Sequence, residues 1–134
     1  MACGGLKVCE RDIDQRLLSS HHAVRVVDFA IVVQSYVSTV SLKNGDKLSV
    51  KVGIHTGEVI SGVVGETKPQ FSLIGASVNK TSRVCSKCPR HKVLISSETQ
   101  KELEENSNNF IFTPTKVFMK GITKANEQET VHIV

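Results

Sequence analysis

Residues 47–65 constrain the fold more than any other part of the chain. Over 47–55, apolar residues alternate with polar or small ones, which is the pattern of a β-strand with one buried face. Thr56-Gly57 predicts a turn, and the next run, 58–64, is apolar at nearly every position, as in a partly or fully buried strand. We therefore expect these two strands to pair with each other.

Three segments have the features of helices. Apolar residues recur every three or four positions over 20–40, which predicts an amphipathic helix. A second helix is expected over 77–86, since Pro89 follows it and cannot continue a helix. A short acidic helix is expected over 98–105, with a serine cap before it.

The remaining elements are short strands separated by turn residues. We expect them at 71–74, 92–95, 109–112, 116–120 and 129–133, with one further strand before the helix over 20–40. The full order becomes β α β β β α β α β β β. Strands mixed with helices that pack on one face predict a single-domain α+β sandwich.

Composition narrows the possible functions. The chain has 134 residues, 40% of them hydrophobic and 22% charged, which is typical of one globular domain. No apolar run reaches the roughly 18 residues that a membrane helix needs, so we expect no membrane contact by this segment. Aromatic residues make up only 4%, which offers few stacking partners for single-stranded nucleic acid.

Charge is distributed unevenly. Residues 67–97 contain no acid but six Lys or Arg residues, a field suited to a polyphosphate or a nucleic-acid backbone. A solvated basic surface without a ligand is the alternative interpretation.

The common short motifs are weak or missing. Cys85 and Cys88 have CxxC spacing, but Cys3 and Cys9 lie too far apart to complete a zinc site, so we expect reduced thiols. The glycine-rich span 53–65 contains neither a P-loop nor a dinucleotide-binding motif.

Asn79 and Arg83 form the most informative pair. Their spacing of four residues places them on one helix face, one turn apart. The amide suits a sugar oxygen, and the guanidinium donates bidentate hydrogen bonds to a phosphate. An Asn and an Arg on a helix surface without a ligand remain the alternative.

Several segments together carry a resemblance to a known family. The runs VGIHTGEVISGVVG at 52–65, KPQFSLIG at 68–75 and VNKTSR at 78–83 resemble the catalytic domain of class III adenylyl and guanylyl cyclases. The similarity continues through VLISSE at 93–98 and MKG at 119–121, and back through MACGGL at 1–6, which resembles the second strand of the family's central hairpin. It implies a ferredoxin-like α+β cyclase sandwich in which 1–134 are the C-terminal two-thirds of the domain, with the first strand and its helices missing.

The resemblance assigns roles to individual residues. Asn79 and Arg83 match the transition-state pair that orients the ribose and stabilises the α-phosphate, and Lys120 matches the lysine that holds the β- and γ-phosphates. Ser72 and its neighbour Leu73 fall where the family binds the purine. Ser lacks the charge that would favour the adenine amino group, so GTP is favoured over ATP.

Cofactors and partners also follow from the resemblance. Two Mg²⁺ or Mn²⁺ ions are expected, with carboxylate ligands from a part of the domain upstream of Met1 or from a partner domain. The family forms its site between two domains, so a second cyclase domain is expected in a homo- or heterodimer. This chain would then be an enzyme half-site that is inactive alone, located on the cytoplasmic side, within a parent protein that is either soluble or membrane-bound.

Two other functions remain open. The chain could be a catalytically silent cyclase-like module that dimerises and regulates, or a basic nucleic-acid-binding module. The first would lack metal-binding aspartates in its parent, and the second would bind oligonucleotides with a steep salt dependence.

Overall fold

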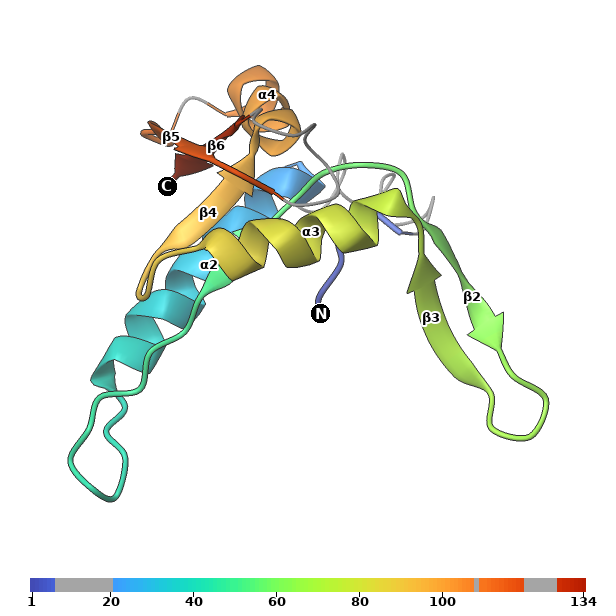
Figure 1. Ribbon diagram of the computed structural model, residues 1–134, viewed down its shortest axis with the longest axis horizontal. Coiled ribbons are helices and arrows are strands. Elements are labelled where there is room, and N and C mark those ends of the chain that lie inside the picture. Colours follow the sequence, from blue (N-terminus) through green and yellow to red (C-terminus); the bar gives the residue numbers. More distant parts are fainter. Residues whose placement is uncertain (7–20, 108, 120–127) are drawn as a thin grey trace.

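The computed structural model describes residues 1–6, 21–107, 109–119 and 128–134 (Figure 1). Its elements in chain order are α2 (His22–Thr39), β1 (Val52–Ile54), β2 (Ile60–Val64), β3 (Gln70–Ile74), α3 (Ala76–Lys87), β4 (Val93–Ser96), α4 (Ser97–Asn106), β5 (Thr113–Val117) and β6 (Glu129–Ile133). The mixture of helices and sheets confirms the α+β class. No helix in the described ranges is long and apolar enough to cross a bilayer.

Four strands form the central sheet in the order β1-β4-β6-β5. β1 pairs with β4 in parallel, while β6 runs antiparallel to both β4 and β5. β4 is buried at all four positions, because helices cover it on both faces. The sheet therefore places the end of β1 and the start of α4 side by side, near α3.

The hydrophobic core lies in two layers, one on each face of this sheet. Val93 and Ile95 of β4 pack with α2 and with Leu103 of α4. Leu94 points the other way, as alternation along a strand requires, and packs with Val84 of α3. The expectation that the helices share one face is thus wrong: α3 covers the face opposite α2 and α4.

β2 and β3 form a separate hairpin that extends away from the four-stranded sheet (Figure 1). β2 pairs with β3 and not with its predecessor β1, and four of its five residues are exposed. Both expectations for 58–64, pairing with the preceding strand and burial, are therefore wrong. A run of apolar residues signals a surface that avoids water, but it does not show whether this chain or another covers it.

Other boundaries also differ from expectation. The strand expected over 47–55 is formed only over 52–54, because β4 is short and pairs with only those three residues. Residues 1–6 form no strand, and the runs expected at 109–112 and 116–120 are replaced by β5 at 113–117. β5 starts at Thr113, the residue that pairs with Ile133 at the end of β6.

The helix ends follow local chemistry. His21 caps α2, with its Nδ1 accepting from the N–H of Ala23, and Ser96 caps α4 by accepting from the N–H of Thr99. α3 begins after Gly75, whose φ of 147° strongly favours glycine. That glycine turns the chain sharply from β3 into α3.

Candidate functional site

Helix α3 carries Asn79 and Arg83 on an exposed face. The two residues lie one helical turn apart, and both side chains are open to solvent. Within the described ranges, neither side chain makes a hydrogen bond or an ion pair. Their polar groups are therefore available to a ligand.

Ser72 and Leu73 lie on β3, where they point to opposite faces of the hairpin. Ser72 is half-buried and pairs with Gly62 of β2. Leu73 lines a large cleft of about 1480 Å³ and a smaller hollow of about 380 Å³. No contact joins Ser72 to Asn79 or Arg83, and neither cleft includes these three residues.

Lys120 lies outside the described residues, so its position relative to α3 stays a prediction. Metal ligands can be assessed for the part of the chain that the structure describes. There, no three His, Cys, Asp or Glu residues gather closely enough to hold a metal ion. Cys85 and Cys88 are free thiols, and burial raises the pKa of the Cys88 thiol.

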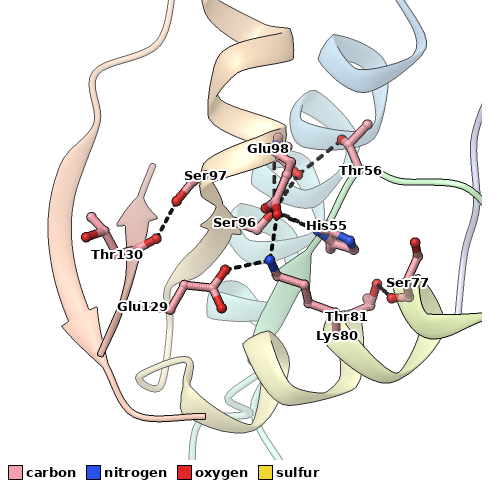
Figure 2. A network of polar contacts seen from close by, with 11 residues as sticks. His55, Thr56, Ser77, Lys80, Thr81, Ser96, Ser97, Glu98, Glu129 and Thr130 are labelled. Atoms are coloured by element: carbon pink, nitrogen blue, oxygen red, sulfur yellow. Dashed lines mark hydrogen bonds and ion pairs between the residues drawn. The ribbon is translucent and has the colours of Figure 1, made fainter. Parts of the chain in front are cut away.

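A partly buried polar network that includes Lys80, the residue after Asn79, was not expected from the sequence (Figure 2). The Nζ of Lys80 donates to Glu98 of α4 and to Glu129 of β6, each at 2.6 Å. His55, at the end of β1, has its Nδ1 2.8 Å from the Oγ of Ser96 and 3.6 Å from Glu98. The network connects α3 to α4, to β6 and to the end of β1.

The charges in this network are mutually stabilised. Burial works against the charge of Lys80, but the hydrogen bonds to Glu129 and Glu98 outweigh it and raise the Lys80 pKa. Burial also works against the charge of Glu98, and the hydrogen bond from Lys80 reverses the effect, so its pKa is lowered. Burial lowers the pKa of His55, which Glu98 only partly opposes. Lys80 and Glu98 are thus ionised, and neutral His55 is favoured.

No local pattern could have revealed these partners. Glu98 and Glu129 lie 18 and 49 positions after Lys80, and the sheet order brings them together. The one local signal was that Lys80, a charged residue, lies next to the apolar face of α3, where a lysine needs an acidic partner. The network fixes α3 against the core and, with it, the direction of Asn79.

The mixed four-stranded sheet and the hairpin that projects from it define an α+β domain. The sequence profile of the adenylate and guanylate cyclase catalytic domain matches residues 1–134. The chain therefore belongs to this family.

Similar sequences include guanylate cyclase beta of Plasmodium falciparum, isolate 3D7, which is 44% identical over 87 residues, or 65% of this chain and 3% of that protein. Guanylate cyclase soluble subunit beta-2 of Rattus norvegicus is 37% identical over 84 residues, 62% of this chain and 12% of that protein. Atrial natriuretic peptide receptor 2 of Anguilla japonica is 35% identical over 86 residues, 63% of this chain and 8% of that protein. The chain therefore spans a small part of the curated relatives that it matches.

Solved structures agree on the fold. The guanylate cyclase domain of RhGC from Catenaria anguillulae, solved in complex with GTP, superposes with a TM-score of 0.73 at 27% identity. The match covers 84% of this chain and 59% of that one. The guanylyl cyclase Cya2 gives a TM-score of 0.72 at 26% identity, covering 85% of this chain and 58% of that one. The cyclase sandwich expected from the sequence is confirmed, and the partial coverage fits a missing N-terminal part.

Proposed function

We propose that this chain supplies the Asn79 and Arg83 half of a purine-nucleotide cyclase site. The reaction converts a nucleoside triphosphate, GTP in preference to ATP, to the 3′,5′-cyclic monophosphate and pyrophosphate. The other half of the site comes from a second cyclase domain.

The observation that carries the proposal is the geometry of α3. Asn79 and Arg83 are exposed, one turn apart and without partners among the described residues, while the adjacent Lys80 is fully engaged in ion pairs. A solvated surface helix can carry the same two side chains. The match of the chain to the cyclase catalytic domain favours a site that receives a sugar and a phosphate from outside the chain.

The chemistry assigned to these residues follows from charge. The ribose 3′-oxygen bonds to the α-phosphorus, and the bond from that phosphorus to the oxygen of the departing pyrophosphate breaks. Negative charge grows on the non-bridging oxygens, where the Arg83 guanidinium lowers the barrier by bidentate hydrogen bonds. Asn79 holds a ribose oxygen so that the attack is in line, and Lys120 would bind the β- and γ-phosphates.

The described residues do not fit the two metal ions that such a reaction uses, since they offer no cluster of carboxylates. We therefore assign Mg²⁺ or Mn²⁺ binding to the second domain or to residues upstream of Met1, and derive no step through the ions.

The hairpin supports a partner domain. Large apolar side chains are exposed on both faces of this hairpin: Ile60, Val64 and Ile74 on one face, and Val63 and Phe71 on the other. An apolar surface of this kind on one protruding element favours protein association. A second copy of this chain, or a related cyclase domain, would complete the site.

Preference for GTP rests on Ser72. Its hydroxyl has no charge to favour the adenine amine and can donate to the guanine carbonyl. The guanylate cyclases among the similar proteins support the same preference.

A complementation assay tests the proposal. The chain is mixed with a complete class III cyclase domain whose own Asn/Arg pair has been removed, and cyclic GMP and cyclic AMP are measured with Mg²⁺ or Mn²⁺. We expect no product from either protein alone and cyclic GMP from the mixture. Arg83→Ala should abolish the rescue, while Lys87→Ala, exposed on the same helix, should not. Association without rescue would favour the silent, regulatory module.

A further inference from the structure

Two cysteines lie across the last turn of α3, and the function proposed above uses neither thiol. Cys88 is the C-cap of the helix, and its N–H donates to the carbonyl of Cys85 at 3.1 Å. Positions three apart in an α-helix have Cα atoms about 5 Å apart, from a radius of about 2.3 Å and a rise of about 1.5 Å per residue. Disulfides join Cα atoms that are roughly 4.4 to 6.8 Å apart. The backbone therefore holds the two cysteines at a distance that a disulfide can span.

The two sulfur atoms lie close to each other at the start of β1 and β4. The Cys85 Sγ donates to the carbonyl of Lys51 at 3.7 Å. The Cys88 Sγ donates to the carbonyl of Lys92 at 3.1 Å, and the same carbonyl accepts from the N–H of Val52 at 3.3 Å. Lys51 and Val52 share one peptide group, so both sulfurs lie beside it. Rotation of the side chains, with a small adjustment at the open end of the helix, brings the sulfurs together.

The two thiols differ in their access to solvent. Cys85 is half-buried, whereas Cys88 is only 1% exposed. Burial raises the pKa of the Cys88 thiol, and the nearby Cys85 acts in the same direction. Because a thiol reacts as its thiolate and must be reached by the reagent, an oxidant from solution meets Cys85 first. Cys88 is then placed to attack the sulfur of Cys85.

A metal site does not explain the pair. In the described ranges, no third His, Cys, Asp or Glu lies close enough to complete a metal-binding cluster with them.

The surface around the pair is positively charged instead. Four basic residues next to the cysteines or to the carbonyls that they contact are exposed: Lys51, Lys87, Arg90 and Lys92. Positive charge of this kind attracts an anionic reagent. Glutathione disulfide, a disulfide with net negative charge at neutral pH, has the matching chemistry.

We propose that Cys85 and Cys88 are a redox-active pair, which an anionic disulfide of the glutathione type converts reversibly to an intrachain disulfide. The Cys85 thiolate bonds to one sulfur of the oxidant, whose S–S bond breaks and releases one glutathione thiolate. The Cys88 sulfur then loses its proton and bonds to the Cys85 sulfur, and the second glutathione thiolate leaves. The two protons from the protein thiols are taken up by the two glutathione thiolates, and the two electrons that the protein loses reduce the oxidant. The proposal concerns thiol chemistry and does not depend on cyclase activity.

Peptide mapping of the full 134-residue chain tests the pair. The folded protein is equilibrated with reduced glutathione and glutathione disulfide at several ratios, with EDTA present. Free thiols are then blocked with N-ethylmaleimide, and the protein is digested with trypsin. Cleavage after Lys87 separates the peptides 84–87 and 88–90, unless a disulfide joins them. We expect mass spectrometry to find the joined peptides in the folded protein, and excess dithiothreitol to separate them again.

Three variants test the roles of the two thiols. In Cys88→Ser, Cys85 should accumulate as a mixed disulfide with glutathione, since the attacking thiol is gone. In Cys85→Ser, modification of the buried Cys88 should be slower by about ten-fold or more. The double variant Cys88→Ser, Lys87→Cys moves the second thiol to an exposed position that does not share a helix face with Cys85. Its intrachain disulfide should form about ten-fold more slowly, or not at all.

Three results would overturn the proposal. The first is the absence of joined peptides at every ratio, including glutathione disulfide alone. The second is joining only after the chain has been unfolded in urea, which would show that the folded structure keeps the sulfurs apart. The third is a disulfide from Cys85 to Cys3 or to another chain in place of Cys88. The complementation assay, run with dithiothreitol throughout, measures cyclase turnover independently of these results.

Discussion

At the scale of single residues, Arg83 and Asn79 are the side chains on which turnover should depend. In the complemented enzyme, Arg83→Ala should lower kcat by about 10²- to 10³-fold with a much smaller change in KM, because its hydrogen bonds strengthen as charge develops in the transition state. Asn79→Ala should behave similarly. Steady-state kinetics with Lys87→Ala as control would check this, and an unchanged kcat would remove the residue from the site.

Base selection is also decided by single residues. Ser72→Asp should raise the ratio of kcat/KM for ATP over GTP about five-fold to a hundred-fold, since an unpaired buried polar group costs roughly 1 to 3 kcal/mol. The carboxylate would face the guanine carbonyl acceptor to acceptor, but would accept a hydrogen bond from the adenine amine. Ser61→Asp, on the neighbouring strand, is a suitable control. An equal ATP-to-GTP ratio of kcat/KM in the unmodified chain, Ser72→Asp and Ser61→Asp would mean that Ser72 does not face the base.

At the scale of elements, the ion pairs of Lys80 hold α3 to α4 and β6. Lys80→Met should lower the free energy of unfolding by about 1 to 3 kcal/mol, because Glu129, only 16% exposed, loses its partner. Lys87→Met, at an exposed position of the same helix, should change it by less than about 0.5 kcal/mol. Urea denaturation measures both. Equal midpoints for the two variants would show that the network does not stabilise the packing of α3.

His55, just after β1, and His132, on β6, should make stability depend on pH. Burial lowers the pKa of His55 and of His132 below the ordinary value of 6.5. The unfolded chain then binds protons at a higher pH than the folded one, so the free energy of unfolding should be greatest above pH 6.5 and decrease as the pH falls below it. Each group contributes at most about 1.4 kcal/mol per pH unit.

Urea denaturation at pH 7.5, 6.5 and 5.5 would measure this decrease. His132→Leu removes one of the two groups and should make the decrease shallower, whereas His91→Leu, at an exposed position, should not. A free energy that rises toward pH 5.5 would contradict the prediction.

At the scale of the whole molecule, the projecting hairpin should determine association. Val63 and Phe71 face each other across the hairpin and are 69% and 64% exposed. Phe71→Lys should weaken binding to a partner cyclase domain at least ten-fold, the loss of about 1.4 kcal/mol typical of an interface anchor. Ile111→Lys, at an apolar residue 88% exposed outside the hairpin, should not. Sedimentation velocity would compare them, and equal weakening would assign the partner surface elsewhere.

The sequence alone determined the elements that depend on interactions between neighbouring residues. The periodicity of α2 and α3, the serine cap of α4 and the glycine before α3 are set by neighbouring residues, so these helices lie within a few residues of expectation. The placement of Asn79 and Arg83 on one face of α3 follows from helix geometry in the same way. The resemblance to cyclases also came from contiguous runs, and the family profile confirms it.

Only the tertiary structure decided which strands pair and which apolar surfaces are covered. Whether β2 pairs with β1 or β3 depends on competing contacts between distant segments, and its exposure depends on the surface that the rest of the chain leaves open. The contacts of Lys80 with Glu98 and Glu129 exist only because β4 and β6 are adjacent. Side chains far apart in the sequence become partners through packing, and no local sequence pattern identifies such partners.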